Sequence, residues 1–498
     1  MTNAALLEKL YAGNPHVRLD EGEVALAATQ RRGSLLYRIA STAVLAVMMA
    51  TTAVADETIV IDFTNRKGPI KPLNGICNVR SPITPGEDGK TAELREIAEL
   101  APSYVRFHDM GGAFGSKYVD IPNVFPDMDA DESDPANYDF AFTDHLVEAV
   151  VAAGAKPYYR LGVTIENYYG AKAYRIYPPK DKAKYARVCE RVVAHYIDGW
   201  ANGFRYDMKH WEFWCEPENR MLWLGGRKEF FEFYAIVART VKAKHPDIKF
   251  GGYGACRFDD FEGLDVNSTS CRQNWLGWFE DFCAFVKEND VPFDFFSWHL
   301  YRADPNRYAW HARDVRDRLD RHGLSQVEAH LTEWGKGGQL GGLRENETLV
   351  VGAYVAACLS EFQKLPIDLA TLYAATPGSM WCPLFTKFGD QTPAYYAFKS
   401  FGLFRRLGTS CAVSDVPRKR IYALAATDGK DKAFMLTNDA LDVPRVIDLD
   451  IRGADGAKWN MYRLDRDHPD FQKVLTPLDL VSVYLPPKGV LLLTTGEF

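Results

Sequence analysis

The sequence has no excess of basic residues and lacks the short motifs that hold phosphates or nucleotides. Its 498 residues include 59 Lys and Arg against 66 Asp and Glu, which gives a net charge of -7. Nucleic acids and anionic membranes bind basic surfaces, so neither is expected as the main partner. No phosphate loop or GxSxG nucleophile elbow occurs, and no GxGxxG follows a predicted strand. The expected ligand is a small or neutral molecule.

Zinc-type clusters of cysteine and histidine are also missing from the sequence. The cysteines are widely spaced, odd in number and contain no CxxC pair. We therefore predict no metal and no cofactor, and buried thiols in place of a disulfide framework, with one or two disulfides left open. The nine cysteines are Cys77, Cys189, Cys215, Cys256, Cys271, Cys283, Cys358, Cys382 and Cys411.

The N-terminal residues 1–55 are expected to be a leader. Residues 31–55 carry positive charges, then a short apolar stretch, then Ala53, Val54 and Ala55 before Asp56, which is the order of a secretory signal peptide. We expect cleavage near Ala55 and a secreted or periplasmic product. A signal anchor is the alternative, because the uncharged residues 39–55 reach the lower limit for a membrane span. The polar residues 1–30 suggest a start codon further along.

Residues 73–404 alternate short apolar runs with amphipathic helical patterns, which predicts parallel β/α construction. Eight alternations can be counted, so we expect a (β/α)8 barrel, with a doubly wound open sheet as the alternative. The expected strands are residues 75–79, 104–108, 156–161, 210–215, 249–253, 293–299, 329–333 and 370–375. The expected helices are residues 91–100, 144–153, 181–198, 227–244, 272–288, 307–321, 347–363 and 393–403.

The last part of the chain, residues 405–498, changes character. Short apolar runs are separated by Asp, Gly, Asn and Pro turns with no helical pattern between them, which predicts a β-sandwich. Residues 56–72, with a strand at 59–63, are expected to join it. The other expected strands are residues 420–425, 433–436, 446–449, 459–464, 481–485 and 489–494.

Two glutamates fall at strand ends, where the chemistry of a β/α barrel lies. Glu216 follows the fourth barrel strand and Glu333 ends the seventh. A retaining glycosidase needs such a pair, one carboxyl protonated to serve the leaving oxygen and the other ionised to attack the sugar. Glu212 and Glu218 are expected to be solvated surface residues.

Four motifs resemble the clan of (β/α)8 retaining glycosidases. They are Trp-x-x-Trp-x-Glu-Pro at residues 211–217, Thr-Glu-Trp at 332–334, Arg-Phe-His at 106–108 and Ser-Trp-His-Leu-Tyr at 297–301. A barrel followed by a β-sandwich is similar to glycoside hydrolase family 39, the β-xylosidase and α-L-iduronidase family, with arabinofuranosidase families as neighbours. The resemblance covers about residues 70–495.

The resemblance implies a role for each matched residue. Glu216 is the general acid/base and Glu333 the nucleophile, while Arg106 keeps the nucleophile ionised or forms a structural ion pair. His108 and His299 contact sugar hydroxyls, and Tyr301 bonds the nucleophile or the ring oxygen. Three tryptophans offer faces for sugar rings or pack in the core: Trp298, Trp334 and Trp381.

One departure from the clan concerns the residue before the acid/base. The clan normally has asparagine there, bonded to the sugar 2-hydroxyl, whereas this chain has Cys215. A thiol is a weak donor, so we expect altered recognition at this position or reduced activity. Arg160 and Arg302, if both point inward, favour a uronic acid substrate.

These observations lead us to expect a retaining, metal-independent glycoside hydrolase of β-xylosidase type that acts on oligosaccharides or polysaccharides. An α-L-arabinofuranosidase or a uronate-specific glycosidase of the same clan is the alternative activity. A carbohydrate-binding pseudoenzyme is the alternative of another class, motivated by Cys215 and by the unusual sequence Tyr-Ala-Ala-Thr at residues 373–376 on the eighth strand. The expected partner is a carbohydrate, and the oligomeric state is left open.

Overall fold

In the computed structural model of the chain, all described residues belong to one compact unit, Glu57–Phe498. The predicted leader and its cleavage site lie outside the described residues. Within the described part of the chain, no helix has the length and apolar character needed to cross a membrane. The structure describes residues 57–79, 94–108, 110, 119–164, 176–219, 222–256, 272–336, 347–377, 379, 381–414, 420–476 and 480–498.

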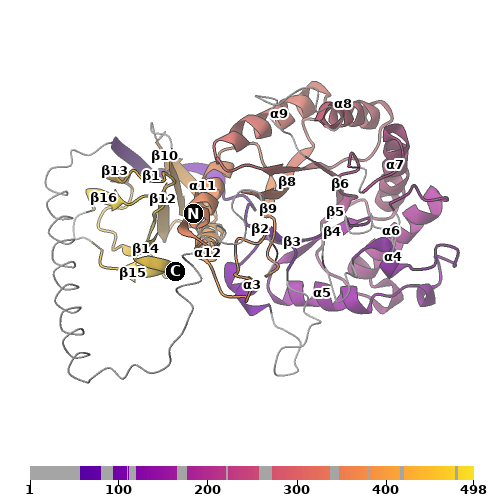
Figure 1. The fold of residues 1–498 in the computed structure, drawn as a ribbon, viewed down its shortest axis with the longest axis horizontal. Coiled ribbons are helices and arrows are strands. Elements are labelled where there is room, and N and C mark those ends of the chain that lie inside the picture. Colours follow the sequence, from indigo (N-terminus) through magenta and orange to yellow (C-terminus); the bar gives the residue numbers. More distant parts are fainter. Residues whose placement is uncertain are drawn as a thin grey trace, which may run out of the picture. The chain divides into compact units, whose positions relative to one another are not determined.

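Eight parallel strands close into a barrel in the order β2 to β9, as predicted (Figure 1). Closure is made by β2 pairing with β9, Gly75 opposite Thr371. Alternate side chains of each strand enter the barrel, so strand starts and strand ends form two separate polar layers. The strands are β2 (Gly75–Cys77), β3 (Tyr104–Phe107), β4 (Lys156–Leu161), β5 (His210–Phe213), β6 (Lys249–Ala255), β7 (Phe295–Tyr301), β8 (Glu328–Gly335) and β9 (Leu369–Leu372).

Helices follow the barrel strands and cover the barrel (Figure 1). Short helices α4 (Ile121–Val124), η3 (Pro135–Asn137) and η5 (Trp200–Asn202) lie in connections and were not expected. The eight expected helices are α3 (Arg95–Leu100), α5 (Ala141–Ala152), α6 (Lys182–Ile197), α7 (Arg227–Lys244), α8 (Arg272–Glu288), α9 (Arg307–Arg321), α11 (Leu349–Phe362) and α12 (Pro393–Leu407).

The other strands form one nine-stranded sheet in the order β15-β14-β17-β12-β11-β10-β1-β13-β16. The predicted N-terminal strand belongs to it, since β1 pairs with β10 antiparallel and with β13 parallel. The sandwich is thus a single sheet in its hydrogen bonding. Its strands are β1 (Glu57–Pro69), β10 (Thr409–Val413), β11 (Ile421–Thr427), β12 (Lys432–Asn438), β13 (Arg445–Arg452), β14 (Asn460–Asp465), β15 (His468–Val474), β16 (Ser482–Leu485) and β17 (Val490–Thr494).

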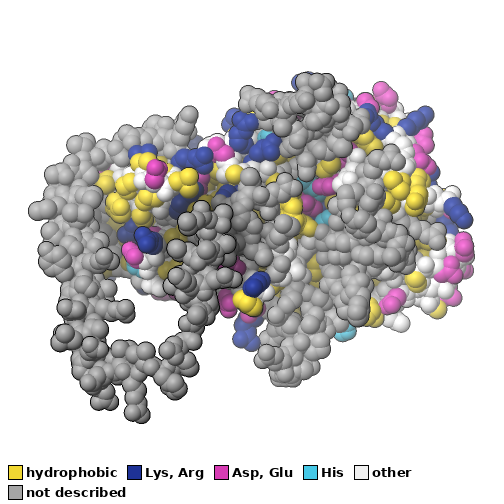
Figure 2. Space-filling model, in the orientation of Figure 1, with side chains coloured by type: hydrophobic (Ala, Val, Ile, Leu, Met, Phe, Trp, Pro, Cys, Tyr) yellow, Lys and Arg dark blue, Asp and Glu magenta, His cyan; other side chains and the backbone are white. Residues whose placement is uncertain are grey.

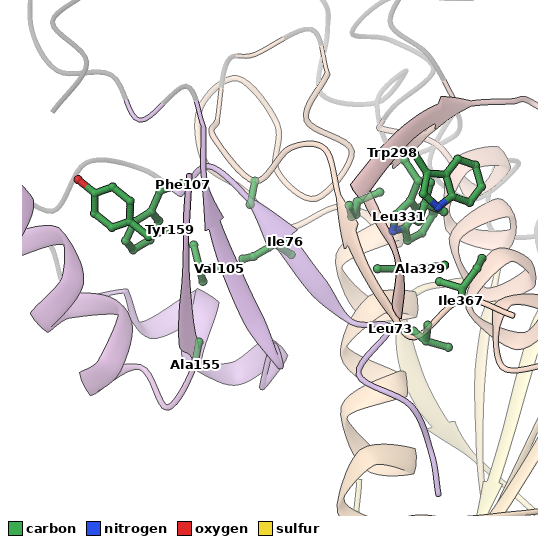
Figure 3. Close-up of a cluster of buried hydrophobic side chains, with 14 of the residues drawn as sticks. Leu73, Ile76, Val105, Phe107, Ala155, Tyr159, Trp298, Ala329, Leu331 and Ile367 are labelled. Carbon is green, nitrogen blue, oxygen red and sulfur yellow. The ribbon is translucent and has the colours of Figure 1, made fainter. Parts of the chain in front are cut away.

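Central strands of this sheet are buried on both faces, which explains their unbroken apolar runs. In β12, Met435 joins the large core of the barrel, whereas Phe434 and Leu436 join a second core with Ile59 of β1. Figure 3 shows part of the large core, including Trp298, Ala329 and Leu331. One face of the sheet therefore shares the large hydrophobic core with the barrel, and the other face has a core of its own.

Candidate active site

The barrel brings Glu216 and Glu333 together. A carboxylate oxygen of Glu216 lies within 4.8 Å of a carboxylate oxygen of Glu333, although the two residues are 117 positions apart in the chain (333 - 216). The turn after β5 places Glu216: its φ is 46° and that of Trp214 is 66°, and the Glu216 N–H donates to the Gly254 carbonyl at 3.0 Å. Both carboxyl groups lie at the carboxyl ends of their strands, at the face where barrels carry their chemistry.

Glu333 is held by one donor on each oxygen. The Arg106 guanidinium donates to Oε1 at 2.9 Å and the Tyr301 hydroxyl donates to Oε2 at 2.6 Å. The Glu333 side chain is only 6% exposed, so these bonds act with little competition from water. Burial and then the charge of Glu333 raise the pKa of Tyr301 well above its usual range, so the hydroxyl keeps its proton. Both oxygens of the Glu333 carboxylate are therefore held in place by hydrogen-bond donors.

Arg106 also pairs with Glu212, its Nε lying 2.7 Å from Oε2. Both side chains are fully buried. Burial alone lowers the pKa of Arg106, but the charges of Glu212 and Glu333 and the neighbouring thiols outweigh that effect and hold the pKa well above its usual range. Arg106 is thus a permanent cation between two buried carboxylates.

His299 lies between the two catalytic candidates. Its Nδ1 is 2.9 Å from Glu216 Oε1 and 3.5 Å from Glu333 Oε2. The ring is 1% exposed, and the Glu216 side chain is 20% exposed. His108 Nε2 lies 3.8 Å from Glu333 Oε1, on the Arg106 side. The predicted cluster of Arg106, His108, His299 and Tyr301 is therefore assembled around Glu333.

Cys215 lies below these groups and is fully buried. Its Sγ is 3.6 Å from Arg106 Nη2 and 3.8 Å from His108 Nε2. Burial raises the pKa of the Cys215 thiol well above its usual range, although Arg106 works in the opposite direction. A neutral thiol held in this way is a poor nucleophile.

The three predicted tryptophans separate into two groups. Trp381 contacts the site, because its ring lies 5.0 Å from the ring of Tyr301, centroid to centroid. Trp298 and Trp334 are fully buried in the large core, and Trp334 packs on Phe362 of α11. The structure does not bring these two to the site, since their strand positions face the covering helices.

Two glutamates that we expected to be solvated have buried carboxyl groups, and this prediction was wrong. Glu212 has no exposed surface because it points into the barrel to meet Arg106, and it also accepts from the Thr332 hydroxyl at 3.3 Å. Both Glu218 carboxyl oxygens are buried, although the residue as a whole is half-buried. Burial raises the pKa of Glu218 well above its usual range, which favours the neutral acid. The expectation of a solvated strand-end residue failed for Glu212 because its side chain points to the inside of the barrel from β5.

The two arginines considered for a uronic acid do not form a pair at the mouth. Arg160 is fully buried and bonds Asp120 at 2.8 Å and the His108 carbonyl at 3.0 Å through Nη2. Arg302 is half-buried, and its Nη1 donates to the Tyr301 carbonyl at 3.3 Å. Arg160 is therefore committed to an internal ion pair.

The sequence reasoning also missed neighbours of the two carboxylates. Asn219 donates to Glu216 Oε2 at 3.4 Å, and the ring of Tyr373 lies between those of His108 and Tyr301, 6.2 and 6.3 Å away. Asn219 follows Glu216 by three residues, a turn spacing that is visible in the sequence. No motif in the sequence places Tyr373 at the site; it directly follows β9, the eighth barrel strand.

Two groups of site residues have metal-ligand spacing, His108 with Cys215 and Glu333, and Glu216 with His299 and Glu333. Both depend on Glu333, whose two oxygens already accept bonds from Arg106 and Tyr301. A cation there would lie beside a guanidinium. The donor set suits proton transfer and nucleophilic attack better than metal binding.

Comparisons with known proteins point to one family. Residues 113–315 match the model of glycosyl hydrolases family 39. The chain is 27% identical over 210 residues to a β-xylosidase from Geobacillus stearothermophilus, a match that covers 40% of the chain and 36% of that enzyme. The chain therefore spans about a third of the length of this relative.

Solved structures share the fold over most of the chain. A glucosidase from Croceicoccus marinus is 23% identical with a TM-score of 0.71, covering 89% of this chain and 99% of its own. A monomeric β-xylosidase from Caulobacter crescentus is 18% identical with a TM-score of 0.63, covering 88% and 99%. At these identities the similarity shows the fold.

Proposed function

We propose that the chain, whose residues 113–315 match the model of family 39 of the glycosyl hydrolases, is a retaining O-glycoside hydrolase of β-xylosidase type. The observation that carries the proposal is the pair formed by Glu216 and Glu333. Their oxygens approach within 4.8 Å. Retaining enzymes separate their carboxyl groups by about 5 to 5.5 Å, whereas inverting enzymes leave roughly 6.5 to 9.5 Å for a water molecule. The observed approach favours retention.

In the first step, Glu333 attacks the anomeric carbon while Glu216 gives its proton to the departing glycosidic oxygen. The C–O bond to the leaving group breaks as the bond to Glu333 forms. Arg106 and Tyr301 orient the Glu333 carboxylate for attack. Hydrogen bonds fixed before the reaction need no reorganisation during it, which lowers the barrier.

In the second step, Glu216 is ionised and takes a proton from a water molecule, which attacks the same carbon and releases Glu333. Two inversions leave the sugar with its original configuration. His299 contacts both carboxylates through one nitrogen and holds them in register while the proton on Glu216 leaves and returns. All proton transfers in this scheme use groups of the chain and water.

The sugar class is proposed from the family and the site together. The relative matched in sequence is a β-xylosidase, and an uncharged pentose fits a site whose buried Arg160 is engaged by Asp120. Trp381 beside Tyr301 offers an apolar face at the half-buried edge of the site. An α-L-arabinofuranoside is the alternative substrate.

A panel of aryl glycosides tests the proposal: β-D-xyloside, α-L-arabinofuranoside, β-D-glucoside, β-D-galactoside and α-L-iduronide. We expect the xyloside to give the highest kcat/KM, and proton NMR to detect the β-anomer of xylose first. Glu333→Gln should lower kcat by at least about 10⁴-fold with an unchanged circular dichroism spectrum, and Glu212→Gln serves as the buried carboxylate control for loss of fold. Initial release of the α-anomer would contradict the mechanism.

A further inference from the structure

A second cluster of polar side chains lies at the opposite end of the barrel from the carboxylate pair. His210 begins β5, Glu328 begins β8 and His330 is two residues further along β8. Alternation along the strands puts Glu328 and His330 on the same inward face. His330 Nε2 lies 3.1 Å and His210 Nε2 3.7 Å from the same oxygen, Glu328 Oε2. One donor atom from each residue lies within 4.8 Å of the other two.

His210 is not satisfied by its surroundings. The residue is 8% exposed, and its Nδ1 has no hydrogen-bond partner among the described residues. Its Nε2 points at Glu328 Oε2 from 3.7 Å, beyond hydrogen-bonding distance. The rings of Tyr104, Tyr158 and Phe295 surround the imidazole at 5.2, 5.8 and 5.9 Å. A buried imidazole nitrogen without a partner is costly, and the other nitrogen has only the long contact to Glu328, so the ring is free to bind a ligand.

The remaining contacts of the cluster orient its side chains as outer hydrogen bonds orient the ligands of a metal ion. Lys249 Nζ holds Glu328 through Oε1, which leaves Oε2 facing the two imidazoles. The Tyr158 hydroxyl lies 3.1 Å from His330 Nδ1 and fixes the ring with Nε2 turned inward. Metal-binding histidines and carboxylates are commonly oriented by such outer contacts. The positive charge of Lys249 weakens cation binding, but Lys249 contacts the oxygen of Glu328 that faces away from the two imidazoles.

We propose that His210, Glu328 and His330 bind a divalent transition-metal ion of the zinc type. Tetrahedral zinc, with bonds of about 2.0 to 2.2 Å, separates its ligand atoms by roughly 3.3 Å, which the observed 3.1 and 3.7 Å bracket. Two imidazoles and one carboxylate favour zinc, cobalt or nickel over calcium or magnesium. The Glu328 side chain is 30% exposed, so water can fill the fourth position.

The ion would tie β5 to β8 across the barrel base. It stands apart from the proposed hydrolysis, whose carboxylates lie at the other ends of the same two strands. An ion that binds the folded chain alone raises its stability in proportion to the logarithm of its concentration over Kd. The role of the site is therefore structural.

Zinc titration of chelator-treated protein tests the proposal. The background is the Glu333→Gln variant, because Glu333 belongs to both other groups with ligand spacing. We expect one Zn²⁺ per chain by calorimetry, a tetrahedral Co²⁺ absorption spectrum, and a Tm raised by roughly 3 °C at 100 times Kd. Adding His210→Gln or Glu328→Gln should abolish all three.

The matched control is His322→Gln, which removes a histidine bonded to Glu280 outside the cluster. It should bind Zn²⁺ as the background variant does. Absence of stoichiometric binding at micromolar Zn²⁺ would overturn the proposal, as would binding retained in both His210→Gln and Glu328→Gln. If one of these variants fails to fold, the other decides.

Discussion

At the scale of single residues, Glu333 is defined by its two donors. A charge-assisted hydrogen bond to a buried carboxylate contributes about 1.5 to 3 kcal/mol, and Tyr301 supplies one at 2.6 Å. Arg106 supplies the other and shares its charge with Glu212. Loss of each donor should have a different effect. Tyr301 donates to one carboxylate, whereas Arg106 neutralises the charge of two, Glu212 and Glu333.

Tyr301→Phe should lower kcat/KM for the aryl xyloside by about 10- to 100-fold with little change in Tm. The variant removes the hydrogen bond that orients Glu333 and keeps the ring that packs on Trp381. Steady-state kinetics and a thermal melt measure both quantities. An unchanged kcat/KM would show that this bond does not act on the nucleophile.

Arg106→Met should destabilise the fold by about 3 to 5 kcal/mol, because it leaves Glu212 and Glu333 buried without their cation. Urea denaturation followed by tryptophan fluorescence measures the loss. Adding Glu212→Gln should restore part of the stability and none of the activity. Equal stability of the single and double variants would argue against a charge effect.

The sequence identified the carboxylate pair and four neighbours, because strand ends and short motifs are local features. It did not identify the partner of Arg106. Glu212 was assigned to the surface because its inward direction depends on the exact strand register. The metal-type cluster was missed for a related reason: His210 and Glu328 are brought together only when the barrel closes.

At the scale of elements, the predicted and observed barrel strands coincide closely, because parallel strands buried on both faces form unbroken apolar runs. Two strands of the C-terminal sheet were missed. β15 buries only Phe471 along its length, so it has no apolar run to detect. β10 begins immediately after α12 and contains only five residues, Thr409–Val413. Apolar patterns cannot reveal a strand that contributes few buried apolar side chains.

Gly75 in β2 tests the packing where the barrel closes. A Cβ there would lie 2.5 Å from Thr371 Cγ2 and 2.7 Å from the Ala370 carbonyl of β9. Gly75→Ala should therefore cost about 1 to 3 kcal/mol of stability. Gly226→Ala is the matched control, since a Cβ there meets nothing within 4 Å. Equal unfolding midpoints for the two variants would contradict the tight contact between β2 and β9.

At the scale of the whole molecule, the sheet and the barrel depend on the same core. Helix α11 is buried along almost its whole length because it packs on the barrel and on β11 and β12. Figure 2 shows acidic and basic side chains intermixed on the visible described surface, in keeping with the absence of a basic face. A shared core of this kind predicts that the two parts unfold together.

Differential scanning calorimetry should give a single transition whose calorimetric and van't Hoff enthalpies agree. A chain ending at Leu407 would leave the outer face of α11 uncovered and should be insoluble. Two resolved transitions in the full chain, or a soluble and folded truncated chain, would contradict the shared core.

The thiols give a pH-dependent prediction. Eight cysteines are free and buried, as expected, and Cys271 lies outside the described residues. Burial raises the pKa of Cys77 to about 12 and that of Cys382 to about 11. The thiolate is the reactive form, so Cys77 and Cys382 should resist iodoacetamide at pH 8 and react only as the pH nears those values or the chain unfolds. Peptide mass spectrometry identifies the modified sites.

The predicted leader, residues 1–55, can be tested on the exported protein. If residues 31–55 direct export, the protein recovered from the culture medium or periplasm should begin near Asp56. Edman sequencing or terminal peptide mapping measures the start. A mature protein that retains residues 31–55 would favour the signal anchor.

The roles of Glu216 and Glu333 are tested most directly by the products that azide forms with the alanine variants. In Glu333→Ala, azide replaces the nucleophile from its own side, so a β-xyloside should give the α-xylosyl azide by a single inversion. In Glu216→Ala, the enzyme-bound sugar still forms from an activated aryl xyloside, and azide replaces the water to give the β-xylosyl azide. Opposite anomers from the two variants are the predicted result. The same anomer from both, or full hydrolysis by Glu333→Ala without azide, would contradict the account.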